Sequence, residues 1–473
     1  MLKLNFFICL SLLAFACSDK VEKQKEIDPN TSAPAKETNR FESFEKGKVL
    51  PTVKCKSDSN NTYALYVPLS YDGNSRFPLV VFFDPHASGA LPLKKYSALA
   101  EKFGFIFAGS NNSKNGNTAE VNGAFAGGIL NDVQARLNLD MKRIYTSGFS
   151  GGSRVASIVA IYRGGINSVI GMGAGFPNID KPIENKFNYV GIAGNQDFNY
   201  TEMEDLEKAL TGSDVDHIFI PFSGKHEWCP LETMDEALTW IEFKDMKRSI
   251  AIKNDSLIKN YIEIQLGKIA QLSKNEAEAF NQCKLALNFI SGLAQNEMLN
   301  ALYSKLEKSG AVKKSIARNE ELAKAEKALK NQYLNALAIK DAVWWKAEVQ
   351  NLTNNKKFPP DQLAMNKRIL SYMSLASYMN INQLLQNKQE QEAEHFISIY
   401  KIVDPENAEA PYLNAKILLS KNKNAEALAE LKNAAKLGFR EHERFSKDFA
   451  ALQAVPGFDS IGTEIKANSV KEE

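Results

Sequence analysis

Three residue types that together perform nucleophilic catalysis occur in this chain in a consistent order. Ser150 is the centre of residues 148–152, which have the pattern Gly-x-Ser-x-Gly; Asp197 follows it and His226 comes last. A serine hydroxyl is a weak nucleophile at neutral pH and needs a base to accept its proton, which an imidazole can do. A carboxylate can hold the imidazole ring and stabilise the imidazolium that forms. The three side chains are therefore candidates for acyl transfer through a covalent intermediate.

The segments around Ser150 predict how its hydroxyl is presented. Residues 143–147 are rich in strand-forming types, and residues 153–161 have a helix-like composition. The serine would then lie on a tight turn between a strand and a helix, where small neighbours let the backbone fold closely. A structural glycine-rich turn with an incidental serine is the competing interpretation.

The acid and the base are both expected at the carboxyl ends of strands. Asp197 ends an apolar strand, and His226 lies in the loop that follows the next strand, residues 217–222. Carboxyl ends of parallel strands share one edge, where open α/β sheets gather their sites. Asp214 and Asp216 precede their strand and so belong at the opposite edge.

Four other histidines compete with His226 for the role of base. His217 begins a strand, so its side chain is expected at the wrong edge. His395 and His442 fall in a helical region and are most simply surface residues. His86 is the remaining rival, although it precedes the serine instead of following the acid.

These residues and their order resemble the α/β-hydrolase family, in particular compact esterases similar to feruloyl esterases and polyhydroxybutyrate depolymerases. The resemblance covers about residues 50–247. It implies a Ser150, Asp197, His226 triad that cleaves carboxylic esters, small or extended, without a cofactor. The same triad cleaves peptides on this fold, so a serine peptidase is an alternative.

The resemblance also implies two backbone N–H donors for the developing oxyanion. Gly151, which follows the nucleophile, would supply the first. The second would come from residues 84–89, where the family more often shows a His-Gly pair. Pro85 has no N–H, which leaves His86 or Ala87.

Strands and helices alternate from residue 62 to residue 243, and the strands are nearly continuous apolar runs. This pattern predicts an α/β domain over residues 46–247 with a doubly wound, mostly parallel sheet covered on both faces. The connection of residues 175–185 is too short for a lid domain. An open site is expected unless the C-terminal half covers it.

Strand signals vanish after residue 247, and residues 248–473 predict an all-α domain. Within residues 371–440 a 34-residue spacing relates small and apolar positions, which resembles tetratricopeptide repeats. Generic amphipathic helices are the alternative. Such repeats could bind a protein partner, so a second hypothesis is a cell-envelope binding or assembly protein whose hydrolase domain is a scaffold.

The N-terminus has the features of an export signal. Residues 1–16 contain an early lysine and a short apolar run, as in a secretory signal peptide. Ala14 and Ala16 fit an ordinary cleavage site, while Ala16 and Cys17 resemble a bacterial lipobox, which would lipidate Cys17 and anchor the protein to a membrane. Residues 17–45 are polar and lack an apolar period, as in a flexible tether. The expected location is the bacterial cell envelope.

Export permits disulfides, and Cys55 with Cys229 is the more plausible pair because both fall in the hydrolase half. Three reduced, buried cysteines are the alternative. The formal net charge of +2 and the absence of a basic cluster argue against nucleic-acid binding. No His, Cys or carboxylate cluster has metal-ligand spacing. Arg154 is expected as an ordinary helix-surface residue, and Trp228 as loop packing or a pocket wall.

Overall fold

The computed structural model describes residues 41–177, 183–354 and 356–470, and residues from Phe41 onward form one compact unit. The expected signal peptide, Cys17 and nearly all of the tether lie outside the described residues. Export and lipidation therefore stay predictions.

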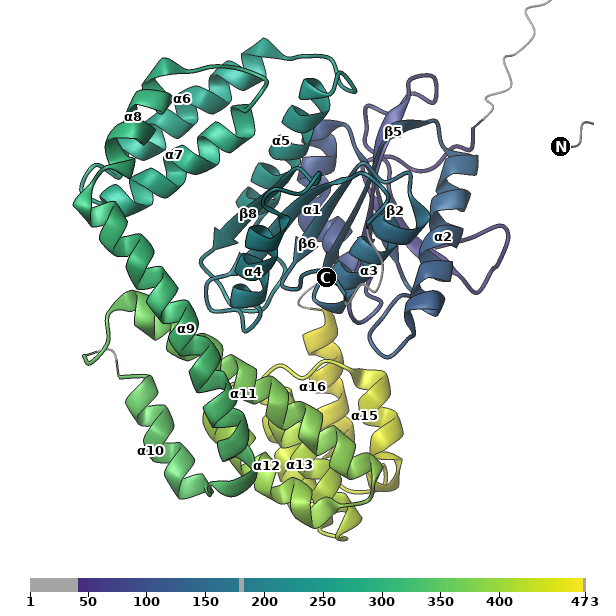
Figure 1. The fold of residues 1–473 in the computed structure, drawn as a ribbon. Helices are drawn as coiled ribbons and strands as arrows, with labels where there is room; N and C mark the ends of the chain where they lie inside the picture. Colours follow the sequence, from purple (N-terminus) through teal and green to yellow (C-terminus); the bar gives the residue numbers. More distant parts are fainter. Residues whose placement is uncertain (1–40, 178–182, 355, 471–473) are drawn as a thin grey trace, which may run out of the picture. The chain divides into compact units, whose positions relative to one another are not determined.

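Eight strands form one sheet in the order β1-β2-β4-β3-β5-β6-β7-β8 (Figure 1). Only β1 with β2 and β2 with β4 are antiparallel; the other neighbours are parallel. The strands are β1 (Val49–Lys54), β2 (Thr62–Tyr66), β3 (Phe77–Phe83), β4 (Ile106–Ser110), β5 (Leu139–Phe149), β6 (Ser168–Met172), β7 (Asn188–Gly194) and β8 (His217–Phe222).

Helices cover both faces of this sheet, which confirms the predicted α/β class. The helices α1 and α5 share a core with one face, while α2, α3 and α4 share a core with the other. Their bounds are α1 (Ala90–Phe103), α2 (Ala119–Arg136), α3 (Gly151–Ile158), α4 (Tyr200–Leu210) and α5 (Leu231–Lys247), and α3 continues into a π-helical turn, η1 (Val159–Arg163).

The central strands are buried on both faces, as their unbroken apolar sequences require. Every residue of β6 and β7 is buried, and so is all of β3 except its first residue. The sequence analysis missed β1, whose VLPTVK sequence contains Pro51 and whose ladder is irregular. Proline lacks the N–H that a ladder needs, so it is tolerated at a sheet edge such as this one.

The chain after residue 247 is helical throughout its described part, as predicted. Asparagine, serine or aspartate side chains accept a backbone N–H at the N-termini of α6, α7, α8, α9 and α10, which explains where these helices begin. The helices are α6 (Asp255–Gln271), α7 (Glu276–Ile290), α8 (Glu297–Glu307), α9 (Gly310–Ile339), α10 (Ala342–Leu352), α11 (Pro360–Gln386), α12 (Glu390–Val403), α13 (Glu409–Ser420), α14 (Asn424–Lys436), α15 (His442–Asp448), the 3₁₀ turn η2 (Ala450–Leu452) and α16 (Phe458–Val470).

The hydrophobic cores do not follow the expected domain limit at residue 247. One core runs from the sheet through α5 and into α6, α7 and α8, ending at Val312. A separate core begins at Leu322 and ends at Ile465. A boundary drawn between cores would therefore fall within α9, while the boundary at 247 stays a prediction.

The positions that carry the 34-residue spacing lie inside the second core. Ile381, Ala393 and Tyr400 are buried on α11 and α12, and their counterparts Ala415 and Ala427 are buried on α13 and α14. Paired helices with small residues at their contacts agree with a repeat-like architecture. Assignment to tetratricopeptide repeats stays a prediction.

The expected bridge between Cys55 and Cys229 is wrong: both are free thiols, as is Cys283. Cys55 belongs to the core on the α2 and α3 face of the sheet, whereas Cys229 belongs to the core on the α1 and α5 face. Burial raises the pKa of Cys55 to about 11 and that of Cys229 to about 12, so both thiols stay protonated at neutral pH.

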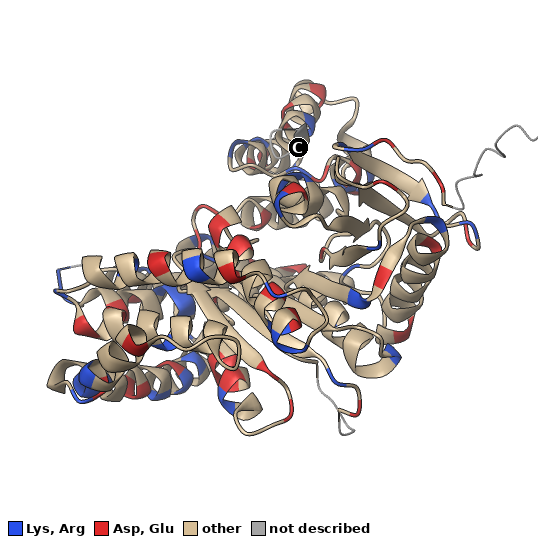
Figure 2. Ribbon diagram, turned by 90° about the horizontal axis from the view of Figure 1, so that it is seen from above, with Lys and Arg blue, Asp and Glu red and all other residues tan. Residues whose placement is uncertain are grey.

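Acidic and basic residues are interspersed along the described elements (Figure 2), in keeping with the near-neutral net charge. Within residues 41–177, 183–354 and 356–470, no helix is long and apolar enough to cross a membrane.

Candidate active site

Ser150 lies on a sharp turn between β5 and α3, as predicted. Its φ of 54° and ψ of −120° are unusual for a residue with a side chain, and its N–H donates to the Met172 carbonyl at 2.8 Å. A Cβ on Gly148 would lie 2.2 Å from the Gly152 oxygen, and one on Gly152 would lie 1.9 Å from the Phe83 oxygen. The two flanking glycines are therefore required by close backbone approach.

The structure brings together the three predicted catalytic side chains. Nε2 of His226 lies 2.9 Å from Oγ of Ser150, and its Nδ1 lies 2.8 Å from Oδ2 of Asp197. Both distances are within hydrogen-bond range. Proton transfer from the hydroxyl to the imidazole, with the carboxylate behind it, is therefore geometrically available.

The surroundings of the triad fix the acid and leave the nucleophile accessible. The side chain of Asp197 is 1% exposed, and its second oxygen accepts the Asn199 N–H at 2.8 Å. The His226 ring contacts two aromatic rings, with centroid distances of 4.6 Å to Phe149 and 4.2 Å to Phe198. Ser150 is only half-buried.

Gly173, to which the sequence analysis assigned no role, also contacts this site. Its φ is +63°, and a Cβ there would lie 3.0 Å from Oδ2 of Asp197 and 3.1 Å from the His226 ring. Only glycine satisfies both the backbone conformation and the space. Its position directly after β6, at the carboxyl edge, was the one available signal.

The two oxyanion donors expected from the sequence differ in their hydrogen bonding. The N–H of Gly151 belongs to the first turn of α3, where no intrahelical acceptor exists. In the other loop, the N–H of His86 donates to Oδ1 of Asp84 at 2.8 Å, and that of Ala87 donates to the Asp84 carbonyl at 3.2 Å. The role of His86 or Ala87 as second donor stays a prediction.

Asn115 is a further polar group at this position. Its Oδ1 lies 1.8 Å from the point that a Cβ on Gly151 would occupy, and its N–H donates to the Pro85 carbonyl at 2.9 Å. No role was expected for Asn115 from the sequence. The fold places its amide group beside the first oxyanion donor.

Trp228 has both features expected from the sequence: it packs its own loop and it forms part of a pocket wall. Its indole N–H donates to Oδ2 of Asp84 at 3.1 Å, which joins the histidine loop to the loop after β3. The cavity has a volume of about 500 Å³ and is lined by Leu91, Lys94, Lys95, Phe149, His226, Glu227, Trp228 and Arg440. A ligand there would lie against His226.

Two of the rival histidines contact backbone carbonyls away from Ser150. Nδ1 of His217 lies 2.8 Å from the Val215 carbonyl, and Nε2 of His395 lies 2.7 Å from the Leu337 carbonyl. His395 and His442 are half-buried and not fully exposed as expected. Arg154 has a structural role: it donates to both oxygens of Glu202, at 2.9 and 3.1 Å.

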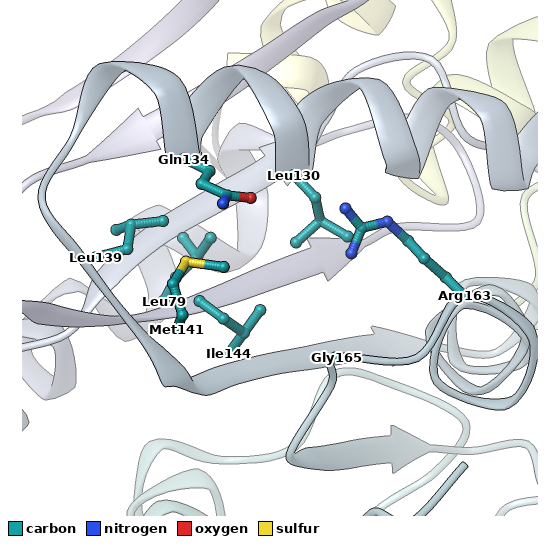
Figure 3. Close-up of a pocket in the computed structure, with 8 residues that line it drawn as sticks. All are labelled: Leu79, Leu130, Gln134, Leu139, Met141, Ile144, Arg163 and Gly165. Atoms are coloured by element: carbon teal, nitrogen blue, oxygen red, sulfur yellow. The ribbon is translucent and has the colours of Figure 1, made fainter. Parts of the chain in front are cut away.

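A smaller cavity of about 80 Å³ lies between α2 and the strands β3 and β5 (Figure 3). Its lining is mostly apolar, and its one ionisable side chain, Arg163, donates to Asn131 at 2.9 Å. It has no group that could perform catalysis. Among the described residues, no group of three His, Cys, Asp or Glu side chains is arranged to hold a metal ion.

Several solved structures resemble part of this chain. A Pyrobaculum calidifontis esterase is 14% identical with a TM-score of 0.31, over 38% of this chain and 76% of the other. An S-formylglutathione hydrolase from Staphylococcus aureus is 14% identical with a TM-score of 0.33, over 38% and 90%. A mutant feruloyl esterase module from Clostridium thermocellum, in complex with sinapinate, is 11% identical with a TM-score of 0.34, over 43% and 90%. No family model matches the sequence, and no curated protein does.

Proposed function

We propose that this protein is a serine hydrolase that cleaves carboxylic esters through an acyl-enzyme on Ser150. The observation that carries the proposal is the hydrogen-bonded chain from Ser150 Oγ through His226 to the buried carboxylate of Asp197. The strained backbone of Ser150 supports it, because strain of this kind is kept where a side chain must be presented.

In the first half-reaction, Ser150 Oγ attacks the ester carbonyl carbon while its proton passes to Nε2 of His226. Asp197 accepts the Nδ1–H and stabilises the imidazolium. The Gly151 N–H, at the start of α3, can donate to the oxyanion as negative charge develops there. The protonated His226 then gives its proton to the leaving alcohol, and the acyl group stays on Ser150.

In the second half-reaction, water attacks the acyl carbon while its proton passes to Nε2 of His226. The bond to Ser150 Oγ then breaks, His226 returns the proton to Oγ, and the carboxylic acid leaves. The cavity of about 500 Å³ beside His226 has the size of a small-molecule site and an apolar wall formed by Leu91, Phe149 and Trp228. The cavity suits a compact acyl or aromatic group.

Ester cleavage is preferred to peptide cleavage on the resemblance alone, so a peptide is the second candidate substrate.

Hydrolysis of short-chain p-nitrophenyl esters and labelling by a fluorophosphonate test this proposal. Ser150→Ala should abolish labelling and lower kcat by about 10⁵-fold or more, because it removes the nucleophile. Ser147→Ala is a matched control on the same strand: its buried Oγ has no hydrogen-bond partner in the described structure, so activity should be unchanged.

Absence of both labelling and hydrolysis in folded wild-type protein would contradict the proposal. It would favour the alternative of a binding or assembly protein that keeps a hydrolase domain as a scaffold. Cleavage of peptides but not of esters would instead favour the serine peptidase.

We also propose that the leader exports the protein and that Cys17 is lipidated, which would attach the enzyme to a membrane of the cell envelope. Metabolic labelling with a radioactive fatty acid should mark the wild type and not Cys17→Ala. Equal label in both proteins, or in neither, would refute lipidation at this residue.

A further inference from the structure

A buried ion cluster connects α9 to α11 in the helical half. Glu326 of α9 is fully buried, and its Oε2 accepts from Nε and Nη2 of Arg368 on α11, at 2.8 and 2.6 Å. Nζ of Lys330, one turn further along α9, lies 2.8 Å from Oε1 of Glu326. One carboxylate therefore pairs with two cationic side chains: Arg368 donates hydrogen bonds to it, while Lys330 contacts Oε1 as an ion pair without hydrogen-bond geometry.

Both cations also bind the loop that carries the catalytic acid. Nη1 of Arg368 donates to the Asn195 carbonyl at 2.9 Å, and its guanidinium lies over the Tyr200 ring, 4.9 Å from the centroid. Nζ of Lys330 donates to the Phe198 carbonyl at 2.8 Å. The helical half thus contacts residues 195–200 before, beside and after Asp197.

The same loop sets the position of His226. Phe198 packs on the histidine ring, and the Asn199 N–H fixes one oxygen of Asp197 while the other oxygen faces Nδ1. The Asn199 side chain donates to the Gly173 carbonyl at 2.7 Å. Displacement of the Asn195 or Phe198 carbonyl would therefore move both the acid and one aromatic wall of the base.

Stability alone is a poor explanation for this cluster. Burying a carboxylate with two cations has a large desolvation cost, and apolar side chains of similar volume often stabilise a buried site as well or better. What the charged groups supply is directed donation to two specific carbonyls. Directed hydrogen bonds fix the positions of these two carbonyls more precisely than apolar packing would.

We infer that Glu326, Arg368 and Lys330 are positioning residues for the Ser150 reaction and that the helical half is part of the catalytic unit. Arg368 and Lys330 hold the 195–200 loop, and Glu326 aims these two side chains. The inference rests on the proposed function. It assigns to residues far along the chain a role that nothing in their local sequence indicates.

The test measures kcat, KM and the low-field proton resonance of the His226 to Asp197 hydrogen bond in the full chain. Lys330→Met removes the donor to Phe198 and leaves Glu326 paired with Arg368, so the variant should fold. It should lower kcat by about 10- to 100-fold with little change in KM, and shift or broaden the resonance. Lys330→Arg should recover much of the lost kcat.

Arg318→Met is the matched control. Arg318 joins the same two helices by donating to Asp361 at 3.1 Å and Gln362 at 3.0 Å, but these contacts lie outside the acid loop. It should leave kcat and the resonance unchanged. Arg368→Lys keeps the charge without the forked donor geometry and should lower kcat in the same way as Lys330→Met.

The inference is overturned if folded Lys330→Met and Arg368→Lys keep the wild-type kcat and resonance, or if Arg318→Met lowers kcat equally. Failure of the proposed function looks different: the wild type would then neither hydrolyse esters nor react with a fluorophosphonate. The resonance would still report whether the cluster positions His226.

Discussion

Single residues at the site are constrained by how close the backbone comes to the triad. The hydrogen-bonded chain of Ser150, His226 and Asp197 has links of 2.8 and 2.9 Å. Gly173 leaves room beside it, and Gly148 and Gly152 let the backbone close around Ser150. A methyl group at any of these glycines would meet another group at 3.0 Å or less. The geometry of the site therefore depends on positions that have no Cβ as well as on the side chains of Ser150, His226 and Asp197.

Gly173→Ala is predicted to impair catalysis beyond its effect on folding. A left-handed φ costs a residue with a Cβ about 1–2 kcal/mol, and here the new methyl group also meets Asp197 and His226. We expect kcat to fall about 10-fold or more. Steady-state kinetics and thermal unfolding would separate the two effects.

Gly165→Ala provides the control for backbone strain. Its φ is +72°, close to that of Gly173, but a Cβ there would have nothing within 4 Å. It should lower the melting temperature while kcat stays near the wild-type value. Equal losses of kcat in the two variants would show that strain alone explains the effect.

Secondary-structure elements are joined by ion pairs away from the active site, and the clearest case involves the segment before β1. Arg136, at the end of α2, donates to both oxygens of Glu42, at 2.9 and 2.7 Å. This hydrogen bonding, opposed by partial burial, lowers the pKa of Glu42 to about 2; Lys56 contributes to the lowering. The N-terminal segment is thereby attached to α2.

The lowered pKa of Glu42 gives a predicted pH dependence. A carboxylate whose folded pKa lies below its unfolded value stabilises the protein above the unfolded pKa, and this contribution is lost as the pH falls toward the folded pKa. Because over a third of the Glu42 side chain is exposed, solvent screening limits the contribution of its ion pair to the free energy of unfolding to about 1 kcal/mol. Glu42→Gln should therefore lower the free energy of unfolding at pH 7. The difference in this free energy between wild type and variant should disappear as the pH falls from about 4.5 to about 2.

Urea unfolding of the wild type and Glu42→Gln at several pH values would measure the difference in their free energies of unfolding. Glu45→Gln is the control: among the residues that the structure describes, Glu45 pairs with Lys48 at the surface, and both side chains are more than half exposed. It should have little effect at any pH. A Glu42→Gln difference that stays constant down to pH 3 would contradict the prediction.

At the scale of the whole molecule, the eight-stranded sheet and the first helices of the second half share one core. Trp240 of α5 donates to Asn288 of α7 at 2.8 Å, and Phe243 packs against Tyr261 and Phe289. Trp240 and Phe243 are fully buried. The α/β fold therefore depends on helices outside the region that resembles hydrolases.

Truncation should reveal this dependence. A fragment of residues 41–247 would expose Trp240 and Phe243, at a cost of about 1.5–3 kcal/mol for each large side chain, whereas residues 41–312 keep the first core intact. We expect the longer fragment to be soluble and to melt cooperatively, and the shorter one to aggregate. Equal solubility and melting temperature would contradict this expectation.

Much of the fold and the site could be predicted from the sequence, because the determining interactions are local. Apolar runs marked the central strands, and the glycines around Ser150 marked a turn between strand and helix. Strand ends fixed the edge at which Asp197 and His226 lie. β1 was missed because an edge strand that contains a proline has too weak a pattern.

The sequence by itself determined the α/β class, the helical second half and the order of serine, acid and base, since each follows from periodicity and turn chemistry within a few residues. Only the tertiary structure decided that Cys55 and Cys229 lie on opposite faces of the sheet and that Asn115 reaches Gly151. It also decided that Arg368 binds the Asn195 carbonyl, 173 residues earlier, in the loop of Asp197. These contacts depend on how distant elements pack, and packing is a property of the whole folded chain.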